Sequence, residues 1–483
     1  MAVQLRDMVV LLPGIGGSVL QRHGTDAWAI SGQASWRALA TLGRSIADLA
    51  LDGDDHEVDD LDDGVTATKL MAGTVIVPGL KKVNGYSATS EWLRSNFEVV
   101  QGSIDDPPEK AANFYEFPYD WRRDVRVAAR KLERLVAARL PRWRTARGAD
   151  DAKVVLLAHS MGGLVARHYV EVMGGWEHCR ALVTFGTPHR GSVSALEFLA
   201  NGYKKAFVDL TELMRSFTSV HQLLPIYPVL DTGTSMTRVA ETRVDGVNAD
   251  AAAEALAFHR AIEAAVAENR RDLRYRDEFS TLVVVGTHQM QTLQSARMAN
   301  GQVTTGTALP PGVPAEMDGG DGTVPMISAV PLELSTGWFD TFVPERHSSI
   351  HLPVVLGPHL LERLKKAQAP GLAQIRGDLA AERPDRRAIS VRVDDLYLPG
   401  EPVELGARLI NFPSAPGGVR VTVTPVGGDT TRRADMAPVA DDQWSVSLEG
   451  LPAGVYAVEV RARQVASGAT LPAPVHDIFE VGG

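Results

Sequence analysis

Ser160 has the sequence context of a reactive nucleophile. The apolar run 153–158 (KVVLLA) precedes it, and MGGLVA follows it, which predicts a buried strand, a tight turn and the start of a helix. Ala158 and Gly162, two residues before and after the serine, are small enough to let the chain pass through a strained turn that presents a hydroxyl. Glycine is usual at the first position, and we expect the turn to tolerate alanine. The alternative is an incidental serine between a strand and a helix.

A serine that attacks a carbonyl needs donors for the oxyanion that forms. The backbone N–H of Met161, directly after the serine, is one predicted donor. We expect the other from Ile15, in the glycine-rich loop 13–18 (PGIGGS) that follows the first apolar run. Such glycines can also cradle a phosphate, but their spacing is not Gly-x-Gly-x-x-Gly and no acidic residue follows a second strand as a dinucleotide fold requires.

The orienting acid is expected after the serine and before the histidine. The first glycine-rich acidic turn after the run 281–286 is MDGGDGTVP at 317–325, and it contains Asp318 and Asp321. An aspartate beside glycines is usually only a turn residue. Its place in the chain favours the acid role, which we assign to Asp321.

The general base is expected directly after the next strand, predicted at Trp338–Val343. His347 has that place, and His351, four residues later, is the alternative base. We favour His347, which would take the proton of Ser160 and deliver it to the leaving group, while Asp321 holds its tautomer.

Other reactive side chains near these motifs are expected to pack. The strand direction should turn His159 away from the nucleophile, and His168 falls on a covering helix. Cys179 stands just before an apolar run, which predicts a buried bystander.

The elements that position these residues alternate between strands and helices. Four Val- or Leu-rich runs predict strands covered on both faces: Met8–Leu12, Lys153–Ala158, Ala181–Phe185 and Thr281–Gly286. Helical spacing appears in Arg126–Leu140, Leu164–Met173 and Ala251–Ala267. Together with the nucleophile turn, this pattern predicts an α/β-hydrolase fold over residues 1–368, with a mostly parallel central sheet and helices on both faces.

Two long segments, 19–74 and 193–279, are predicted cap insertions. The second is rich in apolar residues, among them Phe198, Leu199, Tyr203, Phe207, Leu210, Leu213, Met214, Phe217, Leu223 and Leu224. It is our candidate for a lid over an acyl groove. The alternative is an ordinary helical cap packed on the core.

The chain changes character near Gln368. An Ala-, Pro- and Arg-containing stretch at 369–387 predicts a linker. In 388–483, five runs alternate apolar and polar residues between turns: Ile389–Val393, Val403–Leu409, Val419–Thr424, Trp444–Leu448 and Val455–Val460. They predict a small Ig-like β-sandwich. It shows no catalytic constellation, so we interpret it as a structural or partner-binding module.

Composition excludes several classes of function. The 483 residues carry a formal net charge of −10, which repels nucleic acid. The segment Asp52–Asp63 gathers aspartates without an ordered ligand spacing, so we interpret it as a solvated acidic loop and not as a metal site. We expect no metal and no organic cofactor, because no Cys/His ligand spacing appears and acyl transfer needs none.

The single cysteine permits no internal disulfide. The first seven residues lack the basic and long apolar regions of a secretory signal, and no run is long enough to cross a bilayer. We therefore expect a cytoplasmic protein.

A series of motifs in fixed order resembles the lecithin:cholesterol acyltransferase and lysosomal phospholipase A2 family, including its bacterial relatives. They are VVLLPGIGG at 9–17, PYDWRR at 118–123, AHSMGG at 158–163, FGTPHRGS at 185–192, RSF at 215–217 running to LLP at 223–225, and GDGTV at 320–324 with His347. The resemblance covers roughly the first three quarters of the chain and implies that lipid acyl esters are cleaved through an acyl-enzyme.

The resemblance also implies roles for single residues. It gives Ser160, Asp321 and His347 as the triad, and Ile15 and Met161 as oxyanion donors. It gives Tyr119–Arg122 as site architecture, although Trp121 is equally suited to core packing. The chain departs from the animal members because it has no cysteine pairs to staple a lid, and the family does not explain the sandwich.

These inferences predict a serine lipid acyl hydrolase of the phospholipase A kind, or an acyltransferase where an alcohol replaces water. The alternatives are a soluble carboxylesterase, thioesterase or peptidase with the same triad, and a partner-recruiting scaffold with a vestigial hydrolase fold. The expected partner is a lipid or other acyl ester. A transient contact with a membrane surface and a protein partner for the sandwich stay open. Gating by the lid or by such a partner is our hypothesis.

Overall fold

A computed structural model describes most of the chain. The described residues are 3–28, 48–72, 75–76, 82–83, 85–107, 109–205, 208–286, 292–334, 342–343, 345–353, 388–394, 396–410, 417–426, 430–440, 442–463, 471–472 and 474–482. The predicted linker at 369–387 lies outside them, and so does residue 368, the predicted end of the catalytic domain.

The central sheet has seven strands in the order β20-β17-β12-β11-β2-β10-β9, and every neighbouring pair is parallel. The strands are β2 (Met8–Leu12), β9 (Gln101–Gly102), β10 (Phe114–Glu116), β11 (Val154–His159), β12 (Cys179–Phe185), β17 (Ser280–Gly286) and β20 (Phe342–Val343). All residues of β2 and β11 are buried, as expected for strands that helices cover on both faces. The four predicted central strands are therefore confirmed. Only residues 342–343 of the strand predicted at 338–343 are described.

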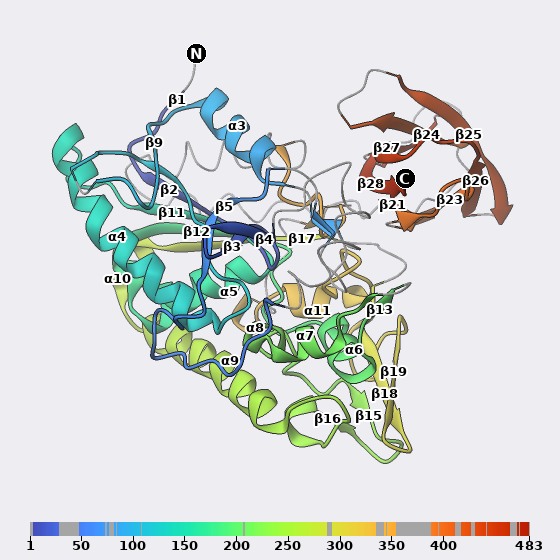
Figure 1. Cartoon of the computed structure of the whole chain (residues 1–483), viewed down its shortest axis with the longest axis horizontal. Helices are drawn as coiled ribbons and strands as arrows, with labels where there is room; N and C mark the ends of the chain where they lie inside the picture. Colours follow the sequence, from blue (N-terminus) through green and yellow to red (C-terminus); the bar gives the residue numbers. More distant parts are fainter. Residues whose placement is uncertain are drawn as a thin grey trace.

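Helices cover this sheet. On one face α4 (Val125–Arg147), α5 (Met161–Arg167) and α9 (Ala249–Asn269) pack together, with a π-helical turn (His168–Val172) continuing α5. Figure 1 shows α3 (Ser87–Asn96) on the opposite side of the sheet. The predicted α/β fold class is confirmed. Among the described residues, no helix is both long and apolar enough to span a bilayer.

The predicted insertion at 193–279 contains short helices: α6 (Val193–Asn201), α7 (Thr211–Ser216), α8 (Thr218–His221) and, before β17, α10 (Leu273–Glu278). Strands β15 (Leu230–Asp231) and β16 (Met236–Thr237) join β18 (Ser295–Ala299) and β19 (Gln302–Gly306) in a small sheet. The described apolar residues of the lid candidate pack into or against the main core, and Phe207 lies outside the described residues. In the described part, this segment has the packing of a helical cap.

The earlier insertion, predicted at 19–74, contains strands of a three-stranded sheet in the order β4-β3-β5. These are β3 (Ser18–Arg22), β4 (Thr25–Trp28) and β5 (Val65–Leu70), and both neighbouring pairs are antiparallel. Residues 29–47 of this insertion lie outside the described part.

The C-terminal region forms the predicted β domain around its own apolar core, and its strand pairs are antiparallel except for a short parallel pair. Its strands are β21 (Ala388–Val393), β22 (Leu396–Tyr397), β23 (Val403–Ile410), β24 (Val419–Pro425), β25 (Arg432–Ala440), β26 (Gln443–Leu448), β27 (Gly454–Ala462) and β28 (Val475–Val481). The first half of β25 pairs with β24 and the second half with β26, so all eight strands form one folded sheet instead of two separate ones. Sequence patterning missed β22, β25 and β28.

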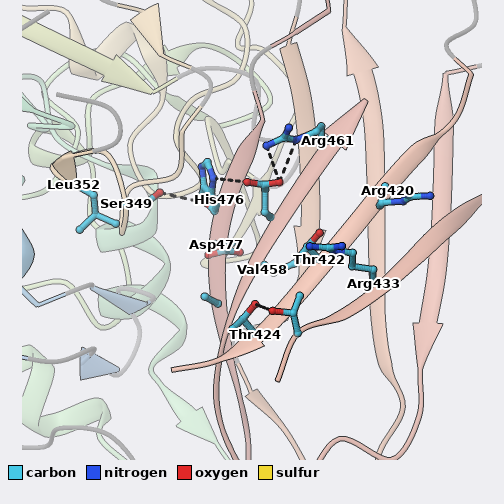
Figure 2. Close-up of a pocket in the computed structure, with 13 residues that line it drawn as sticks. Ser349, Leu352, Arg420, Thr422, Thr424, Arg433, Val458, Arg461, His476 and Asp477 are labelled. Atoms are coloured by element: carbon cyan, nitrogen blue, oxygen red, sulfur yellow. Dashed lines mark hydrogen bonds and ion pairs between the residues drawn. The ribbon is translucent and has the colours of Figure 1, made fainter. Parts of the chain in front are cut away.

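The β domain meets the α/β domain at the loop 345–352. A cavity of about 730 Å³ lies at this junction, lined by Ser349 and Leu352 of the loop and otherwise by residues of the β domain (Figure 2). Figure 1 shows β28 and β21 on the side of the β domain that faces the rest of the molecule.

Candidate active site

Ser160 occupies a strained turn between β11 and α5. Its backbone has φ 52° and ψ −126°, a conformation that L-residues rarely adopt. Its N–H donates to the carbonyl of Phe185 at 2.9 Å, which ties the turn to β12. A Cβ at Gly162 would lie 2.4 Å from the carbonyl oxygen of Pro13, so only glycine lets α5 approach the first loop this closely.

The structure brings Ser160, His347 and Asp321 together, in a line of two hydrogen bonds. His347 Nε2 lies 2.8 Å from Ser160 Oγ, and His347 Nδ1 lies 2.7 Å from Asp321 Oδ2. All three residues are buried. A carboxylate can only accept, so Nδ1 carries the proton and Nε2 is left to accept from the serine hydroxyl. This is the tautomer that general-base catalysis requires.

Asp321 is oriented by its own turn. Its Oδ1 accepts from the backbone N–H groups of Thr323 at 2.9 Å and Val324 at 2.7 Å, leaving Oδ2 for the histidine. Asp318, the other aspartate of this turn, instead accepts from the Gln294 side chain at 2.6 Å. The turn therefore separates the two aspartates, and only Asp321 faces His347.

Three aromatic side chains hold the glycine-rich loop 13–18. Tyr119 Oη donates to the Pro13 carbonyl at 2.8 Å, and the indole nitrogens of Trp121 and Trp28 donate to the carbonyls of Ser18 and Gly16, each at 3.0 Å. Trp121 also packs edge-on against Trp28. The PYDWRR motif thus combines core packing with support for this loop.

Of the two predicted oxyanion donors, Met161 directly follows the serine, and Ile15 follows Gly14, where a Cβ would lie 2.8 Å from Ser160 Cβ. Met161 is the first residue of α5, where a backbone N–H has no partner within the helix. Ile15 is buried at the turn of the loop, and within the described part of the chain its N–H has no protein acceptor. Neighbouring Gly14 has one, because its N–H donates to Tyr86 Oη at 2.7 Å.

His159 does not turn away from the site, contrary to expectation. Its Nε2 lies 2.9 Å from the backbone carbonyl of His347, and its Nδ1 lies 2.8 Å from Tyr86 Oη. Burial, with help from the nearby His351 and His347, holds the pKa of His159 well below its ordinary value, so the ring is neutral. Nε2–H therefore donates to the carbonyl, and Nδ1 accepts from Tyr86.

His159 thus connects three loops of the site. The chain of bonds runs from Gly14 N–H to Tyr86 Oη, from Tyr86 to His159, and from His159 to the carbonyl of His347. The sequence predicts a packing role for His159 and gives no role to Tyr86. The adjacency of His159 to the nucleophile was the available signal.

The other candidates take different places. His351 is fully buried against the ring of His159, with centroids 4.4 Å apart, and it is His347 that meets the serine. His168 stacks on Phe258, and burial lowers its pKa to about 4. Cys179 is buried, as predicted, and burial raises the pKa of its thiol.

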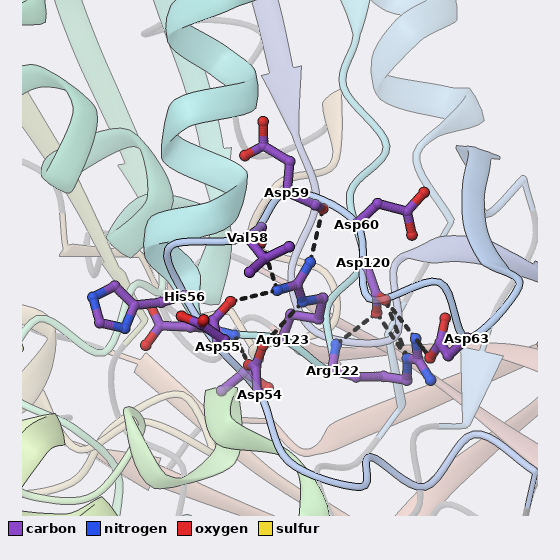
Figure 3. Close-up of polar contacts among 12 residues, drawn as sticks. Asp54, Asp55, His56, Val58, Asp59, Asp60, Asp63, Asp120, Arg122 and Arg123 are labelled. Carbon is purple, nitrogen blue, oxygen red and sulfur yellow. Dashed lines mark hydrogen bonds and ion pairs between the residues drawn. The ribbon is translucent and has the colours of Figure 1, made fainter.

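Two buried arginines of the PYDWRR motif organise the acidic loop (Figure 3). Arg122, whose side chain is 0% exposed, pairs with Asp120 and Asp63. Arg123 pairs with Asp54 and donates to three carbonyls of the loop, those of Asp55, Val58 and Asp59. The loop is therefore anchored at its base and not simply solvated. Within the described ranges, no group of three potential metal ligands occurs.

Comparison with known proteins adds one family. Residues 98–300 match the family model for lecithin:cholesterol acyltransferase. This segment is therefore similar to that family. The lecithin:cholesterol acyltransferase match contains the serine turn and the PYDWRR motif, and it ends before Asp321 and His347. It supports the general expectation of a hydrolase or acyltransferase. No curated protein sequence matches the chain.

Solved structures show weaker likenesses. The mature form of Bacillus licheniformis lipase BlEst2 is 13% identical, with 74% of this chain and 91% of that chain covered and a TM-score of 0.32. Its propeptide form is 12% identical, with 98% and 92% covered and a TM-score of 0.31. A CARDB domain from Pyrococcus furiosus is 11% identical, with 20% and 94% covered and a TM-score of 0.15.

Proposed function

We propose that the chain is a serine lipid acyl hydrolase, phospholipase A-like, that works through an acyl-enzyme on Ser160. The observation that carries this proposal is the hydrogen-bonded line from Ser160 Oγ through His347 to Asp321, at 2.8 and 2.7 Å, on a strained strand-to-helix turn. A merely structural serine has no need of a positive φ and a buried imidazole–carboxylate pair.

The geometry permits each step of acyl transfer. Ser160 Oγ attacks the ester carbonyl while His347 Nε2 takes its proton, and Asp321 stabilises the imidazolium. The backbone N–H groups of Ile15 and Met161 receive the oxyanion of the tetrahedral intermediate. Collapse expels the alcohol, which takes the proton from His347. Water then attacks the acyl-enzyme by the same route, releasing the fatty acid and restoring the serine.

An alcohol in place of water would make the chain an acyltransferase, because the acyl-enzyme is common to both reactions. The match to the lecithin:cholesterol acyltransferase model favours a lipid ester as acyl donor. We keep a cytoplasmic location as part of the proposal, since the single, buried cysteine needs no oxidising compartment.

Purified wild type and Ser160→Ala, given phospholipid vesicles and short-chain esters in parallel, test this function. The matched control is Ser328→Ala, a change at another buried serine. We expect wild type and the control to release fatty acid from vesicles, and Ser160→Ala to release none. Turnover of short-chain esters without phospholipid would favour the carboxylesterase alternative. Vesicle hydrolysis that survives in Ser160→Ala would contradict the proposal.

A further inference from the structure

The loop that carries His347 is held from two sides. On the α/β side, the N–H of His347 donates to the carbonyl of Asp321 at 2.9 Å, and His159 donates to its carbonyl. On the other side, its neighbours Glu345, Arg346 and Ser349 contact the β domain. The β domain therefore touches the segment whose placement decides whether His347 reaches the serine.

Arg346 makes the deepest of these contacts. Its guanidinium forms an ion pair with Asp477 of β28 and donates to the carbonyl of Val391 in β21 at 2.8 Å. The side chains are 13% and 2% exposed, so water screens the pair little. One side chain, adjacent in sequence to His347, thus reaches two strands of the β domain.

A second contact runs through His476, also on β28. Its Nδ1 lies 3.4 Å from Glu345 and its Nε2 lies 3.2 Å from Glu459 of β27. Ser349 donates to Glu345 at 2.8 Å, so the carboxylate is bound from the loop as well. Figure 2 shows His476 between the loop residue Ser349 and the strand carrying Arg461.

Among the described residues, the apolar cores of the two domains form separate clusters. A cavity of about 730 Å³ lies beside the loop contacts. It is lined by Leu352 of the loop on one side and by β-domain residues, among them Arg420, Thr422 and Arg433, on the other. The contacts that the described loop residues Glu345, Arg346 and Ser349 make with the β domain are polar and directional. Directional bonds of this kind fix geometry more sharply than non-directional apolar contact.

We propose that the C-terminal β domain is a working part of the active site, in which Asp477 and His476 are positioning residues that hold the His347 loop through Arg346 and Glu345. This inference rests on the proposed role of His347 as general base. In this proposal, the β domain contributes to catalysis by positioning the His347 loop, although the sequence indicates no catalytic residues in it.

The contact through His476 is pH-dependent. Charged groups face it from the loop (Glu345 and Arg346), from β27 (Glu459 and Arg461) and from β28 itself (Asp477). The bond to Glu345 raises the pKa of His476, burial opposes this, and Glu459 adds to the rise. Protonated, the ring donates to both carboxylates. As pH rises above about 6.5 and through the raised pKa, it loses one donor and the hold on the loop weakens.

Steady-state kinetics on a short-chain ester, with the full chain, test the inference. The variants are Asp477→Asn, Asp477→Glu and His476→Gln. The control is Asp435→Asn, which breaks ion pairs to Arg420 and Arg463 in the same β domain. We expect Asp477→Asn to lower kcat at least about 10-fold with KM nearly unchanged, since a loop displacement of 1 Å can cost about 100-fold. Asp477→Glu should recover part of the loss, and the control should stay within about twofold of wild type.

For His476→Gln, we expect a smaller loss of kcat and the disappearance of one ionisation from the alkaline limb of the pH profile. This side chain is 30% exposed, so the variant should fold even if Asp477→Asn does not. Unchanged kcat in His476→Gln, with an unchanged pH profile, would overturn the inference, as would an Asp477→Asn variant as active as Asp435→Asn. Wild type with no Ser160-dependent activity would overturn the proposed function itself, which is a separate outcome.

Discussion

At the scale of single residues, the site depends on which ring nitrogen carries each proton. The acceptors Asp321 Oδ2 and the carbonyl of His347 fix the tautomers of His347 and His159, respectively. The first arrangement follows from chain order and motif spacing. The contacts of His159 could not be predicted in this way. Strand alternation predicts the direction of its side chain only if the strand continues, but β11 ends at His159, and its partner Tyr86 lies 73 positions earlier in the sequence.

Replacing His159 should lower kcat by more than the accompanying loss of folded protein can explain. In His159→Leu, the loop of His347 loses a donor and Tyr86 loses its acceptor, so we expect kcat per folded molecule to fall by up to about 100-fold. His168→Leu is the control, because it removes a buried histidine that stacks on Phe258 away from the serine. Active-site titration with a fluorophosphonate, followed by kcat measurement, would check this. Equal losses in both variants would contradict the connecting role of His159.

At the scale of elements, burial explains what patterning predicted and what it missed. Strands covered on both faces have continuous apolar runs, and these were found. In β25 only Met436 is buried, so the sequence of this strand does not alternate regularly between apolar and polar residues. In β28, Asp477 and Glu480 are buried polar residues, and Asp477 faces the His347 loop. The strand that serves the active site is the one whose apolar alternation is broken.

Gly186 sets the distance between β12 and the acid. It has φ 54°, and a Cβ there would lie 2.7 Å from Asp321 Oδ2 and 3.0 Å from His347 Nδ1. Gly174, with φ 73°, would meet nothing within 4 Å. Both Gly→Ala changes strain the backbone by about 1–2 kcal/mol. Only Gly186→Ala should also displace the acid and lower kcat by about 100-fold or more. Parallel kinetics and thermal melts check this, and similar kcat values in the two variants would count against it.

Arg122 should matter to stability far more than an exposed arginine of the same loop network. Arg122→Met removes a buried guanidinium and leaves the half-buried carboxylates of Asp120 and Asp63 without their shared partner, for which the about 3–5 kcal/mol of a fully buried pair is the upper limit. Arg134→Met breaks a pair with Asp59 in which both side chains are about half exposed, worth about 0.2–1 kcal/mol. Urea unfolding measures both changes in the free energy of unfolding. Equal values would show that the network is not anchored by Arg122.

At the scale of the whole molecule, the sequence predicted two domains of different class but no contact between them. The pattern of apolar residues indicates which faces of helices and strands are buried, but it does not predict a polar contact such as the ion pair between Arg346 and Asp477. Ion pairs between residues 131 positions apart leave no local signal. From the sequence, we expect the chemistry in the α/β domain and a structural or partner-binding role for the β domain. The contact between the two domains became visible only in the structure.

Buried histidines make the whole fold sensitive to acid. Burial lowers the pKa of His159, His168, His189, His221 and His259. The unfolded chain binds protons at these groups below about pH 6.5 while the folded chain does not, so stability falls as pH falls, by up to about 1.4 kcal/mol per pH unit for each group. Urea unfolding between pH 7.5 and pH 5 should show this slope. His168→Phe should reduce it by about one proton, and an unchanged slope would contradict the assignment.

The central claim is that Ser160 is the nucleophile and that His347 and Asp321 activate it. Covalent labelling with a fluorophosphonate, with the modified residue located by peptide mass spectrometry, tests this most directly. We predict one adduct on Ser160 in wild type, none in Ser160→Ala, and labelling at least about 1,000-fold slower in Asp321→Asn and His347→Ala. Folded wild type that stays unlabelled, or an adduct on another serine that persists in Ser160→Ala, would contradict the account.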